Sequence, residues 1–598
     1  MPHASMNPRR SVSCFWRASA IAALAFSAAG LSSGAEEKSK DVIVELPKVV
    51  VTDSRDLPPP ESWRYATIPG FEILTNASER ETQQLLREFQ LFGIGVDAVW
   101  KGLQEKRGAP IALILCGKGG KFDAFVPRKD NQVETGRVSL FLKDREQTAI
   151  ILDLEAKTVN LSASGVTAQA AEVPAGVDDA GEATGTAAGP ASAFEVNHYQ
   201  QLFREYLRFL LSRSEPRLPA WFEEGLSQLF MGMKVDPTRI AFGKLDDSNE
   251  ATGGDTDFHQ ALQQRGFIPL DQFFAVPHDS PVASRPLGNA WAKQAQGLVH
   301  LWIFGEGRRY GKGLGMFLIR LQREPVSEKL FEECFKMKYK DMLTVFRGYL
   351  SFTNYQSLEW RVPKGEKIPE PAPLVLREAT QSEIGRIKGD ALRLAGFADA
   401  AHTAFSTPYI RGERDPRLLA ALGLEELAAG RDDRASKFLE AAVEGKVERP
   451  RAYLELARLQ SKKHLAKPAG TGGLLDAAQT RDIVAPLLAA RSQPPALPEI
   501  YELMADTLVR SADTSSRETL MILLEGANLF PRRLGIAYQT AVLCIRAGEM
   551  RGATGLVDRA LLIATDEKIK ALFIELKASL PPLPPVTPAA APPAPAKR

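Results

Sequence analysis

The chain has 598 residues, of which 44% are hydrophobic and 25% are charged, enough for about three globular domains with hydrophobic cores. Its 75 Lys and Arg residues nearly balance its 73 Asp and Glu residues. This balance argues against a nucleic-acid-binding protein, because such proteins usually carry a basic excess.

Residues 1–35 have the order of a secretory signal peptide. Three arginines precede an apolar run over about 18–31, and the small residues Ser33-Gly34-Ala35 follow it. The run is too short to cross ~30 Å of hydrocarbon comfortably. We therefore expect cleavage after Ala35, a mature protein without a transmembrane segment, and a periplasmic or secreted location.

The next segments predict a linker and then a small α/β region. Residues 36–62 contain three consecutive prolines and predict the linker. Within 63–161, "FEILTNA" predicts a strand, and Ser78 followed by Glu81 predicts the start of a helix to about residue 100. The runs "APIALILCG", "VSLFLKD" and "TAIILDLE" predict three further strands.

Two features that could indicate a site favour plain structural roles. The "GKGGK" at 117–121 lacks the spacing of a phosphate-binding loop and predicts a tight turn. Cys116, Cys334 and Cys544 are far apart and odd in number, so they indicate neither a disulfide framework nor a metal knuckle. We expect each thiol to be buried as a small apolar group.

The middle of the chain predicts an insertion and then helices. Residues 162–193 are Ala, Gly and small polar residues, which predict a flexible low-complexity insertion. Residues 194–360 predict helices to about residue 355, and residues 361–378, rich in Pro and charge, predict a second linker.

A period of 34 residues appears in the last third of the chain. The segments "AGFADAA" (395–401) and "AGRDDRA" (429–435) are 34 residues apart, and "AGEMRGA" (547–553) follows after 118 more. A spacing of 34 is that of the tetratricopeptide (TPR) repeat, a pair of packed helices. The longer spacing fits only with an insertion, for which the "KPAGTGG" loop at 467–473 is a candidate.

Small and bulky residues recur around these segments as paired helices require. A small residue lies twelve positions before the last Ala of each segment and a bulky one lies four positions after it, so that a large side chain can fill the space that a small one leaves. The pairs are Gly389 and Phe405, Gly423 and Leu439, and Ala541 and Val557. We expect TPR-like helices over 379–579, with a generic helical bundle as the alternative, and a disordered Pro- and Ala-rich tail over 580–598.

The stretch "LFREYLRFLLSRSEPRLPAWFEEGLSQLF" (202–230) resembles the core of gluzincin-type bacterial secreted metallopeptidases. Their usual form is H-E-Y-x-H-x-L-L, a loop, and L-P-x-W-x-x-E-G-L-A. The likeness is most specific in "PAWFEEGL" and extends over roughly 63–355. It implies a zincin-like helical domain beside the sheet.

In that family two His one helical turn apart and a Glu on the next helix bind zinc, while a Glu beside the first His activates water. The resemblance places the two His at Arg204 and Arg208, the general base at Glu205 and the third ligand at Glu224. A guanidinium stays protonated and offers only donors. We therefore expect no zinc, no other cofactor and no catalytic residue, and the four positions are vestigial.

The retained carboxylates call for a counter-charge. Burying Glu205 and Glu224 without one would cost several kcal/mol. We therefore predict that Arg204 and Arg208 pair with Glu224 and with Glu205. The apolar stripe of this helix would leave the charged residues near its margin, and the alternative is that all four side chains lie on a solvated face.

No other histidine restores a zinc ligand set. His198 lies seven positions before Glu205, about 10 Å along a helix axis, which is too far to share one ion. His259, His278 and His300 have no His partner four residues away, and His300 in "LVH" favours a packing role.

Together these features predict an α+β chain: a small α/β sheet with a zincin-like helical domain, followed by an α-helical TPR-like array. The function they favour is that of an exported, non-catalytic peptidase-like protein that binds a protein or peptide through the array, and through the cleft as well. One alternative is an active metal-dependent hydrolase with a non-standard site. Another is an envelope assembly or adaptor protein that acts only through the TPR-like part.

Overall fold

The structure is a computed structural model, and it describes most of the chain after the predicted signal peptide. The described ranges are 46–47, 57–100, 110–161, 192–245, 266–284, 290–351, 357–466 and 474–581, with breaks of one to three residues inside some of them. The predicted signal peptide, most of the 162–193 insertion, the 467–473 loop and nearly all of the C-terminal tail lie outside these ranges. No helix within them is long and apolar enough to span a membrane.

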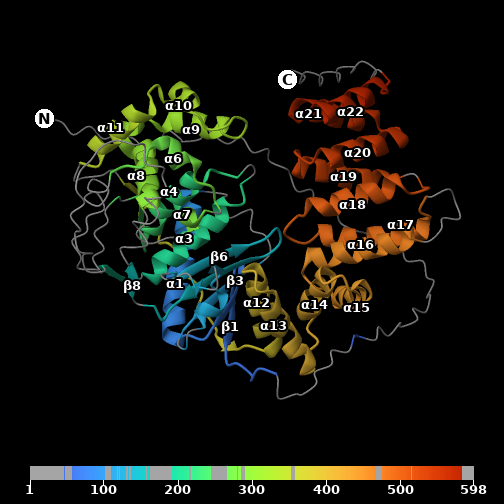
Figure 1. Ribbon diagram of the computed structural model, residues 1–598, viewed down its shortest axis with the longest axis horizontal. Coiled ribbons are helices and arrows are strands. Elements are labelled where there is room, and N and C mark those ends of the chain that lie inside the picture. Colours follow the sequence, from blue (N-terminus) through green and yellow to red (C-terminus); the bar gives the residue numbers. More distant parts are fainter. Residues whose placement is uncertain are drawn as a thin grey trace, which may run out of the picture. The chain divides into compact units, whose positions relative to one another are not determined.

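A mixed six-stranded sheet forms the α/β region (Figure 1). Its order is β13-β1-β2-β3-β7-β6, and β2, β3 and β7 run parallel to one another while the remaining pairs are antiparallel. The strands are β1 (Arg64–Ile68), β2 (Phe71–Thr75), β3 (Ile111–Cys116), β6 (Ser139–Lys143), β7 (Thr148–Asp153) and β13 (Arg377–Glu378). The four strands predicted from the sequence are confirmed.

The long helix α1 (Glu79–Val99) connects β2 to β3. Its N-terminus is capped as predicted, because the Ser78 hydroxyl accepts a hydrogen bond from the Glu81 amide at 3.3 Å. Phe89 of α1 meets Phe71 of β2 edge to face with ring centroids 5.0 Å apart, which fixes the helix against one face of the sheet.

Alternate residues of the central strands enter two different hydrophobic cores. Ile73, Leu113 and Ile150 belong to the core that contains α1 and the following helices. Their neighbours, including Leu74 and Ile114, belong to the core that contains the helical array. Both faces of the sheet are therefore covered, which explains why these strands are apolar at almost every position.

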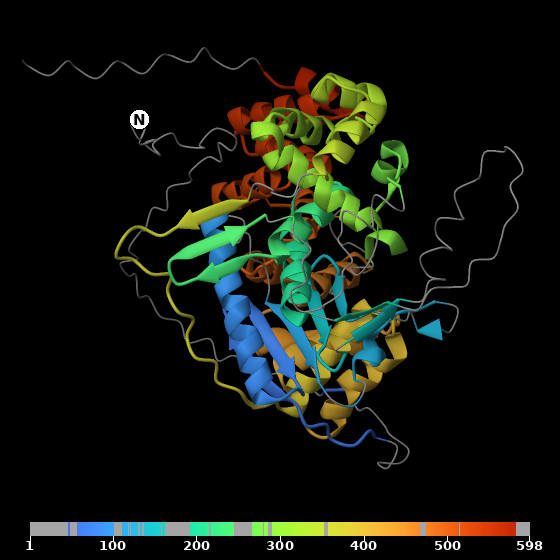
Figure 2. The same cartoon turned by 90° about the vertical axis from the view of Figure 1, so that its left-hand side faces the viewer.

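The helical part after the insertion contains strands that the sequence analysis did not predict. A hairpin of β10 (Lys234–Asp236) and β11 (Arg239–Phe242) pairs with β12 (Leu358–Arg361) in a small antiparallel sheet. It lies near the C-terminal end of α1, where an added Cβ on Gly95 would come within 2.9 Å of Val235 (Figure 2). The prediction of a wholly helical segment to residue 355 was wrong because a three-residue strand carries almost no period of its own.

The remaining elements before residue 358 are two 3-10 helices, two small strand pairs and eight α-helices among the described residues. The 3-10 helices are η2 (Phe122–Phe125) and η3 (Gly305–Arg308). Two further strand pairs are β4 (Arg128–Lys129) with β5 (Gln132–Val133), and β8 (Thr158–Leu161) with β9 (Ser192–Glu195). The helices are α3 (His198–Leu211), α4 (Ala220–Met231), α6 (Leu270–Ala275), α7 (Pro281–Ser284), α8 (Ala290–Phe304), α9 (Gly311–Arg320), α10 (Glu328–Phe335) and α11 (Tyr339–Tyr349).

Two predicted boundaries shift. The insertion predicted to end at residue 193 ends earlier, because strand β9 begins at Ser192. The linker predicted over 361–378 begins with the last residue of β12 and ends in β13, which pairs with β1 at the edge of the sheet. The pairing of β13 with β1 depends on the tertiary structure, so the proline content of the segment could not predict it.

The last third of the chain is an array of antiparallel helix pairs (Figure 1). The described helices are α12 (Gln381–Leu394), α13 (Ala398–Ile410), α14 (Pro416–Ala428), α15 (Asp432–Glu444), α16 (Pro450–Leu465), α17 (Ala477–Arg491), α18 (Pro498–Val509), α19 (Arg517–Leu529), α20 (Leu534–Arg546), α21 (Met550–Ile563) and α22 (Glu567–Ala578). The predicted TPR-like array is confirmed as a series of antiparallel helix pairs.

The three recurring segments form the turns inside the helix pairs. Gly396, Gly430 and Gly548 have left-handed backbone angles with φ of 89°, 73° and 79°. In each turn the amide of the following residue reaches back to a carbonyl of the first helix, as from Phe397 to Leu392 at 2.9 Å. This left-handed helix stop favours glycine, which has no Cβ to strain the backbone, and this accounts for the recurrence of Ala-Gly in the sequence.

The predicted contacts between small and bulky residues occur. A Cβ on Gly423 would lie 2.8 Å from Cγ of Leu439, and one on Gly389 would overlap the ring of Phe405. The predicted insertion also lies where expected. The first helices of successive pairs begin at residues 416, 450, 498 and 534, so the intervals are 34, 48 and 36 residues, and the longest contains the 467–473 loop.

Buried charges join the array to the sheet. Arg386 of α12 donates to both oxygens of Glu72 on β2 at 2.6 and 2.9 Å, and Arg417 donates to the same carboxylate at 2.7 Å. Arg449 pairs with Glu146 in the β6–β7 turn at 3.3 Å. These contacts make the array part of the same packed body as the sheet.

Candidate functional site

Helices α3 and α4 carry the four residues that the sequence singles out. Asn197 caps α3, since its side chain accepts a hydrogen bond from the Gln200 amide at 3.1 Å. Pro219 precedes α4 and has an extended backbone that the helix cannot include. The short break between the two helices folds them back on each other, and this turn brings α3 and α4 into contact.

Arg204 and Glu224 form a bidentate ion pair. Nε of Arg204 donates to Oε1 of Glu224 at 3.0 Å, and Nη2 donates to Oε2 at 2.6 Å. The planar guanidinium matches the planar carboxylate, so both oxygens of Glu224 are engaged by one partner. Gln228, one turn later on α4, donates a further hydrogen bond to Oε1 at 2.8 Å.

Glu205 is held by both arginines and by the sheet. Nη1 of Arg204 donates to its Oε1 at 2.8 Å, and Nη1 of Arg208 donates to its Oε2 at 3.1 Å. The hydroxyl of Ser139, at the start of β6, donates to Oε1 at 3.0 Å. The structure therefore brings Arg204, Glu205, Arg208 and Glu224 together, as the charge argument predicts.

This set of side chains lies inside the protein. The side chains of Arg204, Glu205 and Glu224 are 0%, 2% and 3% exposed, and that of Arg208 is 15% exposed. The alternative of a solvated face is wrong for the first three. The expectation that they lie at the margin of an apolar stripe is also wrong, because α3 is buried on nearly every side.

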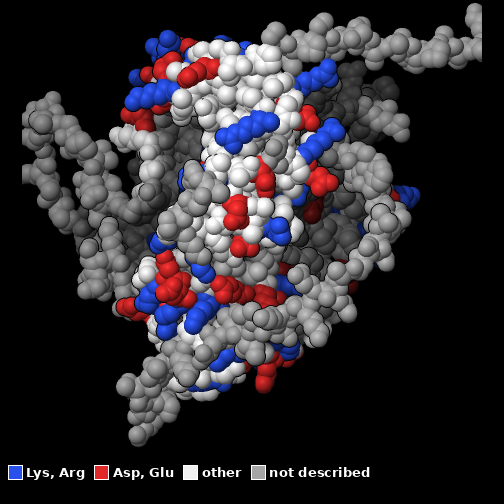
Figure 3. Space-filling view, turned by 90° about the vertical axis from the view of Figure 1, so that its right-hand side faces the viewer, with Lys and Arg blue, Asp and Glu red and all other residues white. Residues whose placement is uncertain are grey.

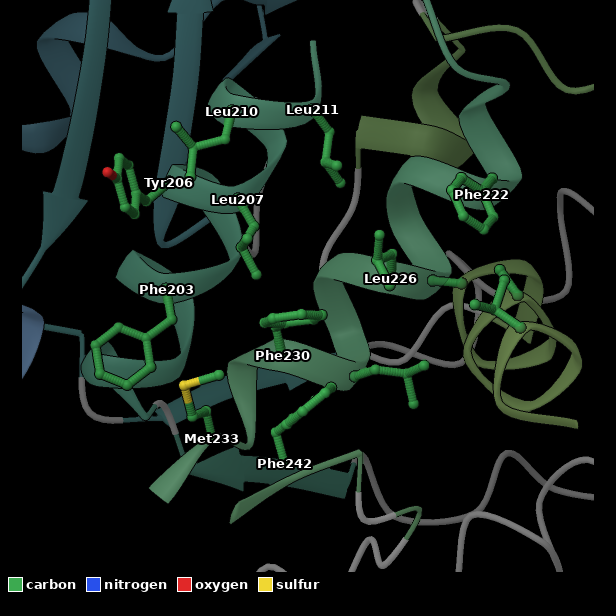
Figure 4. Close-up of a cluster of buried hydrophobic side chains, with 14 of the residues drawn as sticks. Phe203, Tyr206, Leu207, Leu210, Leu211, Phe222, Leu226, Phe230, Met233 and Phe242 are labelled. Atoms are coloured by element: carbon green, nitrogen blue, oxygen red, sulfur yellow. The ribbon is translucent and has the colours of Figure 1, made fainter. Parts of the chain in front are cut away.

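Apolar side chains surround the charges. Leu207 of α3 and Leu226 and Phe230 of α4 lie between the two helices (Figure 4). Phe203 of α3 instead stacks on Phe92 of α1, with ring centroids 4.0 Å apart. Trp221 is buried against Trp302, with ring centroids 5.4 Å apart. In such surroundings an unpaired charge would be costly, so each buried charge here depends on its partner.

The pairing sets the protonation states. Burial raises the pKa of the Glu205 carboxyl, but Arg204 and Arg208 more than offset it and hold that pKa below its usual value. Burial alone would lower the pKa of Arg204, whereas Glu224 and Glu205 raise it above its ordinary value. Glu205 is therefore an ionised partner of two guanidinium groups and is not poised as a general base near neutral pH.

A close crossing of two helices positions α4. A Cβ on Gly225 would lie 2.5 Å from the Ala295 carbonyl oxygen of α8, so only glycine fits there. This glycine belongs to the "PAWFEEGL" block. It lets α4 approach α8 and thereby fixes Glu224 opposite Arg204.

The residues present do not fit a zinc ion. The two positions that should supply lone pairs carry guanidinium donors, and the oxygens of Glu224 already accept hydrogen bonds from Arg204. In the described part of the chain, no group of three or more His, Cys, Asp or Glu side chains is placed to hold a metal ion.

The histidines take other positions. His300 is buried, with Nε2 2.8 Å from the Gly243 carbonyl and Nδ1 2.8 Å from the Tyr349 hydroxyl, which supports a packing role. His278 lies 3.3 Å from Glu223. His198 is the first residue of α3, and burial lowers its pKa. His259 lies outside the described residues.

Cys116, Cys334 and Cys544 are buried free thiols, as expected. In the predicted turn the Gly117 amide donates to Asn76 at 2.6 Å and the Gly119 amide donates to Glu155 at 3.0 Å. These two amides are thus already used by side chains of the protein itself.

Sequence analysis missed three polar partners near this site. Ser139 is followed by three apolar residues in β6, and nothing in its neighbouring sequence points to a carboxylate 66 positions later. Arg217 donates to both oxygens of Glu223 at 2.9 Å, a pair that lies on opposite sides of a helix boundary. Gln228 is four residues after Glu224, so helical spacing could have identified it.

No protein-family model and no curated protein matches the chain. Solved structures of TPR proteins are similar to it. One is a thermophilic TPR protein of Thermus thermophilus, with 17% identity, 32% of this chain and 97% of that chain covered, and a TM-score of 0.23. Another is YrrB, a TPR protein with an unusual peptide-binding site, with 14% identity, 32% and 88% covered, and a TM-score of 0.25.

PilF of Pseudomonas aeruginosa is also similar, with 12% identity, 33% of this chain and 83% of that chain covered, and a TM-score of 0.24. These TM-scores are low, so the description of the repeats depends on the helix pairs themselves. The chain combines a small mixed sheet, a helical part that buries the Arg204 network, and a TPR-like helical array.

Proposed function

We propose that this protein is an exported, non-catalytic relative of gluzincin-type peptidases that binds a protein or peptide. The array supplies the main binding surface, and the former catalytic cleft accepts an extended chain without cutting it. The observation that carries the proposal is the ion pair between Arg204 and Glu224, which joins the position of a zinc-binding His to the position of the third zinc ligand.

The chemistry of this pair supports a non-catalytic role. Zinc-dependent hydrolysis needs neutral imidazoles that bind the metal and a carboxylate that is free to take a proton from water. Here both positions that would carry an imidazole carry a guanidinium group. Glu205 accepts hydrogen bonds from Arg204, Arg208 and Ser139. The side chains that would perform the reaction instead stabilise the fold.

The array supports the binding role. Stacked helix pairs present extended surfaces to partner chains, and such surfaces are a common use of helical repeats. One face of the molecule shows charges of both signs scattered among uncharged side chains, without a patch of one sign (Figure 3). That distribution and the near-neutral net charge favour a protein or peptide over nucleic acid.

Export is proposed from the sequence alone. The basic residues, apolar run and small residues of 1–35 have the order of a signal peptide, and they lie outside the described residues.

Metal content and peptidase activity test the non-catalytic role. The purified mature protein should contain no stoichiometric zinc after dialysis, and added zinc or a chelator should not change its action on a casein or peptide-library substrate. Stoichiometric zinc together with chelator-sensitive cleavage would establish the competing function, an active metal-dependent hydrolase.

Restoring the imidazoles tests the relation to zinc peptidases. The double variant Arg204→His, Arg208→His places two imidazoles one helical turn apart, beside Glu224. We expect it to bind one zinc ion per chain, measured by elemental analysis after dialysis. A matched variant, Arg204→Leu with Arg208→Leu, should bind none. If the His variant is folded by circular dichroism and binds no zinc, the proposed relation is wrong.

Cross-linking to proteins of the native envelope tests the binding surface. The full mature chain is used, because Arg386, Arg417 and Arg449 would lose their sheet partners in an isolated array. Cross-links from a partner to residues 381–578 are expected. Cross-links confined to 63–351 would move the binding surface to the cleft, and the absence of specific cross-links from both ranges would refute the binding role.

A further inference from the structure

The end of the array exposes an unusual number of apolar side chains. Five of the fifteen exposed large hydrophobic residues in the described ranges lie within 562–574, at the end of α21 and in α22 (Figure 1). Single exposed apolar side chains are ordinary on a protein surface, whereas a concentration in one short segment marks a contact surface. The five residues are Leu562, Ile563, Ile569, Leu572 and Ile574.

The position of α22 in the array makes this exposure significant. The terminal helix of a stacked array normally has a polar outer face, because no further repeat covers it. Helices α12–α21 form five pairs, and α22 follows as the first helix of a sixth. Phe573 holds α22 against Tyr538 of α20, with ring centroids 5.6 Å apart. The described part of the chain contains no second helix to complete this pair.

One side of α22 carries an apolar stripe. Ile569, Leu572 and Leu576 follow one another at intervals of three and four residues, so they lie along the same side of the helix. Ile569 and Leu572 are exposed, and Leu576 is half-buried. Two helices pack along a shared seam through residues at this spacing. These three residues are here called the α22 stripe.

Two charged side chains of α22 have no partner within the described chain. Lys577 lies 2.8 Å from Asp558 of α21 and is therefore paired inside the array. Lys568 and Glu575 are exposed, and their side chains make neither an ion pair nor a hydrogen bond with any described residue. Both charges are available to a partner outside the chain.

The two charges are placed as a second copy of α22 requires. Lys568 directly precedes Ile569 and Glu575 directly precedes Leu576, so they lie along the same edge of the α22 stripe, two turns apart. A second α22 that runs antiparallel along the stripe, about a two-fold axis near Leu572, brings Lys568 of each copy beside Glu575 of the other. A parallel second copy would instead place each charge at the level of its own equivalent.

We infer that two copies of this chain associate through the α22 stripe, with their α22 helices antiparallel. The exposed apolar side chains supply the surface that becomes buried, and the pairs of Lys568 with Glu575 determine the orientation. A two-fold contact closes on itself, so it gives a dimer and not a filament. The inference depends neither on the relation to zinc peptidases nor on the identity of the protein or peptide that the array binds.

Sedimentation velocity of the mature chain, from low micromolar concentration upwards, measures the association. A dimer that forms as the concentration rises is expected. Leu572→Asp should raise the dissociation constant at least about 30-fold, because the change is present in both copies near the axis. The matched variant Leu488→Asp, at an exposed position of α17, should leave it unchanged. A monomer at every concentration, or a dimer that survives Leu572→Asp, would overturn the inference.

Exchange of the two charges tests the orientation. Lys568→Glu brings two carboxylates together in each half of the contact and should weaken association several-fold at low ionic strength. The double variant Lys568→Glu, Glu575→Lys restores opposite charges in an antiparallel pair, and its dissociation constant should return to within about two-fold of the original. Both residues are exposed, so this test remains valid if Leu572→Asp does not fold. A double variant that associates no better than Lys568→Glu would contradict the antiparallel contact.

The segment that follows α22 is the other candidate to cover the stripe. A chain that lacks residues 582–598 should form the same dimer with the same dissociation constant. If a dimer appears only after this removal, the segment covers the stripe, and if the dimer disappears, the segment itself makes the contact. Either of these results would refute association through the α22 stripe.

Discussion

The helical part around α3 and α4 and the helical array are stabilised by different kinds of interaction. In the array, small and bulky residues 16 positions apart meet, as Gly423 meets Leu439, and the pattern repeats along the chain. Around Arg204, charges and polar groups from three elements meet once, and the separations run up to the 66 positions between Ser139 and Glu205. Packing between neighbouring helices of the array leaves a repeating pattern in the sequence. A buried network that occurs once leaves no such pattern.

The difference also sets how each region responds to change. A buried ion pair stabilises little in net terms, because desolvation opposes attraction, but removing one partner leaves a charge in an apolar space. A well-packed glycine contact instead resists any added volume. Variants of each kind therefore test whether the two regions differ as described.

The largest expected effect is that of Glu224→Ala. The variant leaves the buried Arg204 without the carboxylate that accepts two of its hydrogen bonds. We therefore expect the free energy of unfolding, measured by denaturant titration, to fall by about 3–5 kcal/mol. The double variant Arg204→Leu, Glu224→Leu should lose less, because no charge remains unpaired. The exposed control Glu332→Ala should change little. A loss below about 1 kcal/mol for Glu224→Ala would show that the network is irrelevant to stability.

The junction between sheet and array should show a pH-dependent effect. Burial raises the pKa of Glu72, but Arg386 and Arg417 outweigh it and lower that pKa to about 2, from an ordinary 4.5. A lowered pKa stabilises the folded state above pH 4.5, by about 3 kcal/mol here, and this stability is lost as the pH falls from 4.5 towards 2.

Glu72→Gln should therefore be less stable than the unaltered protein by about 3 kcal/mol at neutral pH, and the difference should shrink below pH 4.5. Denaturant midpoints measured between neutral pH and about pH 3 test this. The control Glu79→Gln removes only an exposed pair with Arg64, and it should change stability by less than about 1 kcal/mol. A difference that is constant with pH would contradict the assignment.

The smallest effect is expected inside the array. In Gly423→Ala the new Cβ would lie 2.8 Å from Cγ of Leu439, which is fully buried and has no room to move. Strain should outweigh the gain in helix propensity and lower stability by about 1–3 kcal/mol. The control Gly555→Ala meets no heavy atom within 4 Å and should raise stability by up to about 1 kcal/mol. Thermal unfolding of both variants decides the sign, and a stabilised Gly423→Ala would contradict the packing account.

Some of the fold could be predicted because the signals are local. The strands, the cap at Ser78 and the Ala-Gly turns of the array depend on residues within one element or one turn. The small sheet with β10 and the pairing of β13 could not be predicted, because two or three residues carry no period and their partners lie far along the chain. The contact of α12 with the second face of the sheet likewise has no local signal.

The candidate site divides in the same way. Residue type alone determined that Arg204 and Arg208 are permanent cations that cannot replace imidazole ligands, because their chemistry does not depend on the fold. Only the tertiary structure decided that Arg204 donates to both oxygens of Glu224 and that Ser139 donates to Glu205. The identity of a charge is a property of one side chain, but its partner and its burial depend on where distant segments of the chain meet.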